Sequence, residues 1–238
     1  MKLNVFRTTI KDGNFTKEKK YYPNLSTKEI DLLYETNINR LLQKTGLDIK
    51  NYVILSAKNN DLKSRTVTAT TKKVKEQILT LKGITPNVAV LVETTDDPVI
   101  VASAKETCAI ALGTIENINN NILHEMIETL IKETDAAPFE MTFYITGCPS
   151  QDNYKLDSID KLTDKYIWKD TYIKKRKKYY LDIRYAIYNQ LLYEIVDPHY
   201  IYFDSKDTTE NKTTHQKVNW HKWLAGVYLA YILRLFLE

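Results

Sequence analysis

Two adjacent carboxylates, Asp96 and Asp97, are the side chains in this sequence best placed to do chemistry. They precede Pro98 and stand between two short apolar runs that are typical of strands. Carboxylates at the end of a strand can bind Mg²⁺ or act as a general base. Adjacent aspartates before a proline are also a common turn signature, so a purely structural interpretation stands beside the catalytic one.

Histidine and cysteine, the other residue types that commonly act in sites, show no site-like spacing. The four histidines are His124, His199, His215 and His221, and none of them belongs to an H-x-x-x-H or H-E-x-x-H motif. The only cysteines, Cys108 and Cys148, are too few for a disulfide framework. We interpret both as buried thiols, and a reducing cytoplasm is the simplest location for them.

The basic run at residues 174–178 is the most conspicuous charge feature. We interpret it as a solvated loop before a helix, with a nucleic-acid or phosphate patch as the alternative. The net charge of +4 is too small and too dispersed to require a nucleic-acid partner. The few glycines form neither G-x-G-x-x-G nor a P-loop, and no apolar run reaches the roughly 18 residues of a membrane span.

The elements that would position these groups follow from the apolar pattern. Strands are predicted over 2–9, 52–56, 64–71, 87–92, 99–102, 107–112, 139–146 and 201–203, helices over 25–45, 117–132 and 180–194, and a strand or helix over 223–236. Ser26 and Glu29 predict a capping box, and Gly46 predicts the end of that helix. Strands and helices alternate without a linker or repeat, which predicts one α/β or α+β domain over 1–238.

Taken in order, these segments resemble the YfiH-like laccase-domain family, whose members are described as purine nucleoside phosphorylases. The matches are Glu35, Asn37, Arg40 and Leu41 in a helix motif E-x-N-R-x-R-L, Thr94, Asp96, Pro98 and Val99 in V-x-T-A-D-C-L-P-V-L, Tyr154 in G-P-x-I-G-x-x-x-Y-E-V-G, and residues 180–183 in Y-L-D-L. The resemblance covers nearly the whole chain. It implies a single-domain, layered α/β/β/α sandwich with mixed sheets.

The resemblance also implies site residues. Asp96 and Asp97 become the candidate catalytic pair, and Asn37, Arg40 and Tyr154 become candidate substrate-binding residues. Members of the family bind zinc or copper through two histidines and one cysteine. Those three positions align here with Asn59, Asp97 (or Asp96) and Leu112 (or Ala111). An amide or an aliphatic side chain cannot replace an imidazole at such a metal, so we expect no metal cofactor.

Two functions follow from this resemblance. The first is an enzyme that phosphorolyses or deaminates adenosine- or inosine-type nucleosides. The replacement of the family's Trp-Arg by Ile115 and Glu116 argues against the first, because it removes a cation that could hold phosphate. The alternative is a catalytically inactive, metal-free relative that acts as a ligand-binding or interaction module. The expected partner is a small molecule related to a purine nucleoside, with no membrane or nucleic acid, and the oligomeric state stays open.

Overall fold

Two mixed β-sheets form the centre of the molecule. The computed structural model describes residues 2–7, 15, 17–46, 49, 51–83, 87–94, 96–163, 166–205, 207–208 and 226–233. The first sheet has the strand order β1 (Lys2–Arg7), β13 (Gly226–Leu233), β5 (Val88–Thr94), β2 (Asn51–Leu55). The second has the order β12 (Ile201–Phe203), β8 (Thr142–Ile145), β6 (Val99–Ala104), β7 (Thr107–Leu112), β4 (Glu76–Lys82), β3 (Asp61–Thr66).

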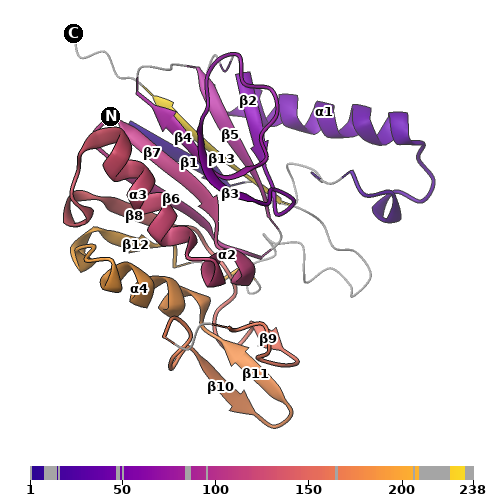
Figure 1. Ribbon diagram of the computed structural model, residues 1–238. Coiled ribbons are helices and arrows are strands. Elements are labelled where there is room, and N and C mark those ends of the chain that lie inside the picture. The colour runs from indigo at the N-terminus through magenta and orange to yellow at the C-terminus, as the bar shows by residue number, and fades with distance from the viewer. Residues whose placement is uncertain are drawn as a thin grey trace.

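Helices cover the outer face of each sheet (Figure 1). Helix α1 (Thr27–Lys44) lies against the first sheet, and α2 (Ile115–Asn119), α3 (Ile122–Thr134) and α4 (Ile183–Tyr193) lie on the side of the second. Single turns of 3₁₀ helix occur at Lys19–Tyr21, Pro138–Glu140 and Pro198–Tyr200. This layering is the α/β/β/α sandwich that the resemblance predicted, so the predicted fold class is confirmed.

The alternation of side chains along the central strands produces these layers. In β5, Val90 and Val92 pack between the sheets, whereas Ala89 and Leu91 pack against α1. Successive residues of a strand point to opposite faces, so a strand that is apolar at every position can serve two cores at once. The inter-sheet core, the cluster of buried residues between the two sheets, consists of Val53, Leu55, Val67, Leu79, Leu81, Val88, Val90, Val92, Val99, Val101, Cys108, Ile110 and Leu112.

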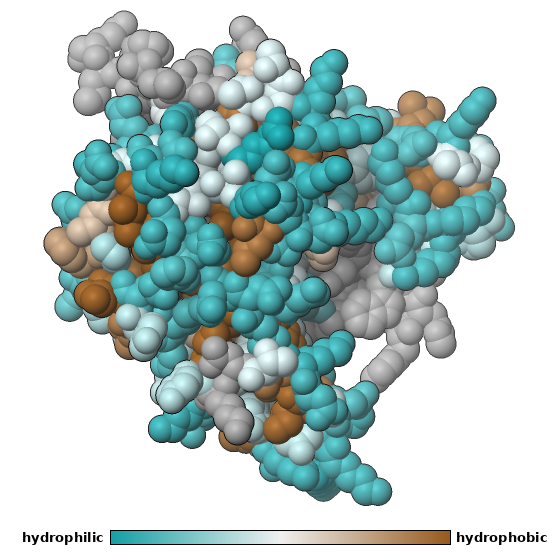
Figure 2. Space-filling model, viewed as in Figure 1, coloured by the Kyte–Doolittle hydropathy of each residue, from teal (hydrophilic) through white to brown (hydrophobic). Residues whose placement is uncertain are grey.

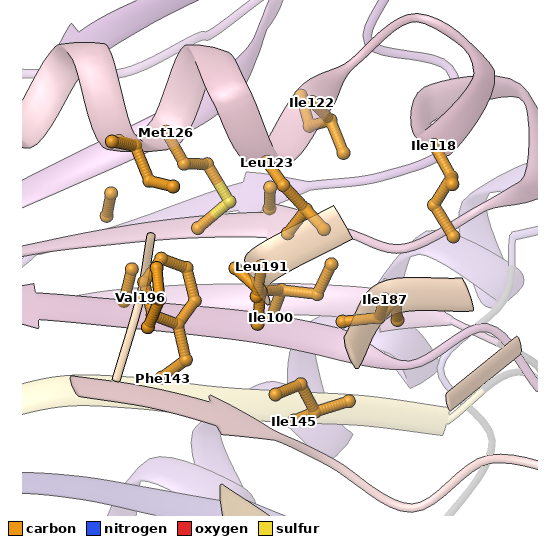
Figure 3. Packing of buried hydrophobic residues seen from close by; sticks show 14 of the residues in the cluster. Ile100, Ile118, Ile122, Leu123, Met126, Phe143, Ile145, Ile187, Leu191 and Val196 are labelled. Carbon is orange, nitrogen blue, oxygen red and sulfur yellow. The ribbon is translucent and has the colours of Figure 1, made fainter. Parts of the chain in front are cut away.

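A third core fills the space between the second sheet and its helices. Leu123 and Met126 of α3 point toward Ile100 and Phe143 of the sheet, and Leu191 of α4 lies beside them (Figure 3). Burial of each such side chain contributes about 1.5–3 kcal/mol. On the outside, hydrophilic residues cover most of the face in Figure 2, and hydrophobic ones lie in small separate groups.

Helix α1 begins and ends as its sequence predicts. Ser26 Oγ accepts from the Glu29 backbone N–H at 3.3 Å, and Glu29 Oε2 accepts from the Ser26 N–H at 2.6 Å, which completes the capping box. Gly46 follows the helix with φ +69°, a conformation that other residues adopt only with strain. The strand-or-helix segment 223–236 is a strand in its described part, β13.

Several sequence-based predictions were wrong in detail. The strand predicted over 64–71 is β3, the strand predicted over 139–146 begins only at Thr142, and the helix predicted over 180–194 begins only at Ile183. Strand β4 was not predicted at all, although it lies between β7 and β3 in the second sheet. The helix predicted over 117–132 is two helices, because Asn121 takes φ 57° and breaks the helical path. The predicted loop over 174–178 belongs to a β-hairpin, β10 (Tyr172–Lys175) and β11 (Lys178–Leu181), which forms a small third sheet with β9 (Lys155–Leu156). In the described part of the chain, no helix has the length and apolar character that crossing a bilayer requires.

Candidate functional site

A polar cavity of about 450 Å³ lies beside one end of the second sheet, next to α2. Its described lining comprises Ala57, Asn59, Asn60, Gln77, Asp97, Thr114, Ile115, Glu116, Asn117, Asn119, Tyr154 and Lys161. These residues come from the segment after β2, the start of β4, the turn before β6, helix α2 and the segments on either side of β9. Cavities of about 300–1,000 Å³ are typical of small-molecule sites.

Asp97 provides a half-buried carboxylate in the cavity. The turn that holds it is fixed by Thr94 Oγ1, which donates to the Asp97 carbonyl oxygen at 2.7 Å, and by the hydrogen bond from Gly113 N–H to the Pro98 carbonyl at 2.8 Å. Loss of hydration in this position raises the pKa of Asp97 to about 6. The carboxyl group can therefore accept or release a proton close to neutral pH.

Tyr154 joins Asp97 in the cavity, so the structure brings together one candidate catalytic and one candidate substrate-binding residue. Burial raises the pKa of the Tyr154 hydroxyl, and the nearby Asp97 raises it further. The phenol therefore stays protonated and can donate a hydrogen bond to a ligand.

Asp96 has a different place from its neighbour. It does not line the cavity, and its Oδ1 accepts from Thr208 Oγ1 at 3.3 Å. Thr208 adjoins Asp207, whose Oδ2 accepts from the Ser150 N–H at 3.1 Å and from Asn153 Nδ2 at 2.9 Å. Asp96 therefore makes a structural contact, whereas Asp97 lines the cavity.

The remaining candidates lie on α1. Asn37 is buried and Arg40 is exposed, and the described lining of the cavity contains neither. Two residues that the sequence analysis did not select, Gln77 and Asn117, form part of the wall instead: Gln77 Nε2 donates to Asn117 Oδ1 at 3.0 Å. Nothing in the sequence marks this pair, because an amide has no diagnostic spacing and β4 itself was not predicted.

The positions aligned with the family's metal ligands do not form a zinc or copper site. Asn59 and Asp97 line the cavity, but Asn59 Nδ2 donates to the Glu76 carbonyl at 2.8 Å. Leu112 is 2% exposed within the inter-sheet core, and Ala111 is buried in the core beneath the helices. One amide, one carboxylate and an aliphatic residue lack the imidazole and thiolate donors that these ions prefer. Nor do His, Cys, Asp and Glu gather in threes anywhere among the described residues.

Both cysteines are buried thiols, as predicted. Cys108 lies in the inter-sheet core, where burial raises its pKa to about 12. Cys148 is in contact with Arg184, whose Nε donates to Cys148 Sγ at 3.3 Å. Burial outweighs this cation and raises the pKa of Cys148 to about 11, so the thiol is not activated as a nucleophile.

The described histidines also lie away from the cavity. His124 pairs with Glu194 (Nδ1 to Oε2, 3.0 Å), and His199 pairs with Asp197 at 2.9 Å. Both pairs are at the surface. His215 and His221 lie outside the described residues.

Comparison with solved structures identifies the fold. YfiH from Bacillus licheniformis aligns with a TM-score of 0.75 at 14% identity, over 96% of this chain and 92% of that one. YlmD from Geobacillus stearothermophilus aligns with a TM-score of 0.71 at 15% identity, over 84% of this chain and 80% of that one. A DUF152 protein from Neisseria meningitidis aligns with a TM-score of 0.70 at 16% identity, over 97% of this chain and 94% of that one. No family model and no curated protein sequence matches the chain. The chain therefore has the fold of the YfiH-like proteins, as the resemblance of its sequence predicted.

Proposed function

We propose that this chain is a divergent YfiH-like protein that binds a purine nucleoside, or a small molecule of that kind, without zinc or copper. One observation carries the proposal. A cavity of small-molecule size is lined by Asn59 and Asp97, two of the three positions where the resemblance places metal ligands, while the third, Leu112, is buried in an apolar core. The cavity therefore lies at these positions without the imidazole and thiolate donors that zinc and copper prefer.

The lining favours a ligand without phosphate. Asp97 and Glu116 bring carboxylates to the cavity, and Lys161 is the one cation in the part of its lining that the structure describes. Asn59, Gln77 and Asn117 make most of the rest of the described polar lining neutral, so it adds no positive charge that would attract a phosphate. The balance of charge therefore supports a nucleoside over a nucleotide.

Isothermal titration of the purified chain with adenosine and inosine, in buffer containing EDTA, tests the proposal. We expect one molecule bound per chain, with affinity lowered in Asp97→Asn and kept in Asp96→Asn. Asp96 is the matched control, since it stands one position away and outside the cavity lining. Absence of binding, together with an unchanged melting temperature for every nucleoside tried, would contradict the proposal.

A second candidate, turnover of the nucleoside, is supported by the pKa of about 6 at Asp97. In deamination, water adds to C6 of adenosine and ammonia leaves, and a general base must take a proton from the water and return it to the leaving nitrogen. Asp97 has the acidity for that task. In phosphorolysis, phosphate displaces the base from C1′, and a protonated Asp97 could donate to the departing base.

Product analysis separates turnover from binding. The chain is incubated with adenosine, inosine or methylthioadenosine, with and without phosphate, and free base, ribose 1-phosphate and deaminated nucleoside are quantified. Activity that survives EDTA and disappears in Asp97→Asn supports the enzyme. Tight binding with no product supports the binding module.

The proposal includes a cytoplasmic location and one domain over 1–238. The two buried free thiols, Cys108 and Cys148, support the location, because thiols persist in a reducing compartment. The proposed partner of the cavity is a small molecule.

A further inference from the structure

The small third sheet, formed by β9, β10 and β11, gathers the positive charge of the molecule in one place. Its strands and the turn between β10 and β11 carry basic residues and no acidic one: Lys155, Lys174, Lys175, Arg176, Lys177 and Lys178. Two carboxylates outside the strands pair with this set, Asp152 with Lys175 at 2.7 Å and Asp157 with Lys178. The excess that remains equals the net charge of +4 of the whole chain. A charge that looks dispersed in the sequence is therefore local in the fold.

One face of this sheet attaches it to the rest of the molecule. Residues that pair across strands share a face, and so do alternate residues along a strand. By this rule Tyr172, Leu181 and Leu156 lie on the same face. Leu181 is fully buried in the core beneath the helices, and Tyr172 and Leu156 pack against that core. The hairpin of β10 and β11 extends outward from this attachment (Figure 1), so the opposite face of the sheet points away from the core.

The opposite face combines an aromatic ring with cations. Tyr180 occupies the middle strand, with Ile173 opposite it on β10 and Lys155 opposite it on β9. Lys175 and Lys178 form the next row of that face. The Nζ atoms of Lys155 and Lys175 lie 5.9 and 5.2 Å from the centroid of the Tyr180 ring. All three lysines are exposed and Tyr180 is partly exposed, so a ligand can reach the ring and the charges together.

The tip of the hairpin is not optimised for stability. Its two turn residues are Arg176 and Lys177, and Arg176 has φ 57°, a left-handed conformation that favours glycine or asparagine. Lys175 and Lys178 face each other across the strands, where like charges repel. Lysine on an edge strand discourages pairing with another chain, but that role does not require five consecutive cations. An anionic partner explains the run better than folding does.

The chemistry of this face suits single-stranded nucleic acid. Lysine contacts a phosphate as a point charge and reads no base, so its contacts are independent of sequence. A tyrosine ring stacks with a base whose face is accessible in a single strand and covered in a duplex. An anionic membrane would attract the same charges, but the turn residues Arg176 and Lys177 offer no apolar side chain for insertion at the tip.

We propose that this basic face, formed by Lys155, Ile173, Lys175, Lys178 and Tyr180, binds single-stranded nucleic acid without sequence preference. Phosphates contact the lysines and the turn residues, and one base stacks on the tyrosine ring. None of the five residues lines the cavity beside α2, so the basic face is a second binding surface. The proposal develops the alternative interpretation of residues 174–178 and does not rest on the function proposed for the cavity.

Fluorescence anisotropy with the full chain tests the proposal. The probes are labelled 20-nucleotide oligouridylate and oligothymidylate, titrated between 0.05 and 0.3 M KCl. We expect a dissociation constant between about 1 and 100 μM at 0.1 M salt and a slope of log affinity against log salt of about −2 to −4. The two probes should agree within about threefold, because phosphates and base faces are common to both. A duplex of the same length should bind more weakly than either.

A glycine variant separates binding from folding. Arg176→Gly removes one positive charge and relieves the left-handed backbone, so its melting temperature should equal or exceed that of the wild type. Its affinity for oligouridylate should fall by about three- to fivefold at 0.1 M salt, with a salt slope shallower by about 0.7. Lys132→Gln is the matched control, because it removes one exposed positive charge from α3, outside the small sheet. It should keep the affinity within about twofold.

A tyrosine variant tests the stacked base. Tyr180→Leu keeps an apolar side chain and removes the ring, so affinity for oligouridylate should fall at least fivefold while the salt slope stays unchanged. Tyr202→Leu, at a 50% exposed position on β12, is the matched control and should bind as the wild type does. Thermal unfolding establishes that both variants are folded at the titration temperature.

Several results would overturn the proposal. They are no binding of the wild-type chain to the oligonucleotides at 0.05 M salt, binding of only one of the two probes, or a duplex that binds as tightly as the single strands. An equal loss of affinity in Arg176→Gly and Lys132→Gln would also overturn it. Capture by phosphatidylserine vesicles without oligonucleotide binding would assign the hairpin to a membrane instead. Nucleoside binding is measured separately, so failure here leaves the function proposed for the cavity intact.

Discussion

The inter-sheet core and the cavity share strand β4, but the core is built from apolar side chains and the cavity from mostly polar ones. Leu79 and Leu81 of that strand are buried in the core, where every side chain is apolar. Gln77, two residues earlier, lies in the cavity wall with an oxygen that has no partner. The core depends only on the size and alternation of apolar side chains. The cavity depends on individual polar atoms, so its chemistry can change while the sheets stay as they are.

This difference explains how the chain can share a fold with proteins to which it is only 14–16% identical, because the sheets do not depend on the polar residues that line the cavity. Leu112 shows the separation most clearly, because its side chain is part of the inter-sheet core while its carbonyl oxygen accepts from Asn117 of the cavity wall. Perturbing one region should therefore leave the other largely unaffected.

The largest expected effect comes from the core. Leu79→Ala removes the isopropyl part of a side chain with no exposure and should lower the free energy of unfolding by about 2–5 kcal/mol. Urea denaturation measures the loss. Leu32→Ala is the control, because Leu32 on α1 is 69% exposed, and it should change the free energy of unfolding by no more than about 0.5 kcal/mol. Nucleoside affinity of the folded Leu79→Ala protein should stay within about twofold. A loss of affinity in step with stability would break the distinction between the two regions.

The second prediction concerns Asp97 and pH. Because its pKa is raised from 3.8 to about 6 in the folded state, the folded chain binds the proton more tightly than the unfolded chain. The stability that this proton contributes is complete below about pH 4 and is lost as pH rises through 6. Asp97→Asn should abolish that loss and stabilise the protein by about 2–3 kcal/mol at pH 8 relative to wild type.

Urea unfolding at pH 4, 5, 6, 7 and 8 measures this dependence. Asp96→Asn keeps Asp97 and should keep the wild-type decline between pH 4 and 6. If Asp97→Asn showed the same decline as the wild type, the desolvated carboxyl would have to be sought elsewhere in the molecule.

The smallest expected effect concerns charge in the cavity. Glu116 is an exposed carboxylate on its rim, so Glu116→Arg should shift the affinity ratio of AMP to adenosine toward AMP by about two- to fivefold. Titration of both ligands in low salt measures the ratio. Glu128→Arg, an exposed position on α3 outside the cavity lining, should leave it unchanged. A larger shift in Glu128→Arg would mean that the long-range field, not the cavity, selects the ligand.

The sequence predicted the parts of the fold that are encoded locally. The capping box joins Ser26 and Glu29, which are only three positions apart in the sequence. The uninterrupted apolar runs of β5 and β7 indicate buried strands by themselves. Both features could therefore be recognised without a structure. Strand β4 could not, because the polar Glu76, Gln77 and Thr80 interrupt its apolar character, and only its place between two other strands makes it a strand.

The site could be predicted only where a residue is conspicuous in the sequence itself. Asp97 stood out as one of two adjacent carboxylates, but no sequence pattern distinguishes it from Asp96, whose carboxylate accepts a hydrogen bond from Thr208. The contacts of Gln77 with Asn117 and of Arg184 with Cys148 join residues 40 and 36 positions apart. Such pairs are created by tertiary packing, and no local pattern encodes them.

The most direct test of a nucleoside cavity that works without zinc or copper is a titration with adenosine in two buffers, one with EDTA and one with added Zn²⁺. The account predicts one ligand per chain and the same dissociation constant in both. No binding in either buffer, or binding that appears only with Zn²⁺, would contradict it.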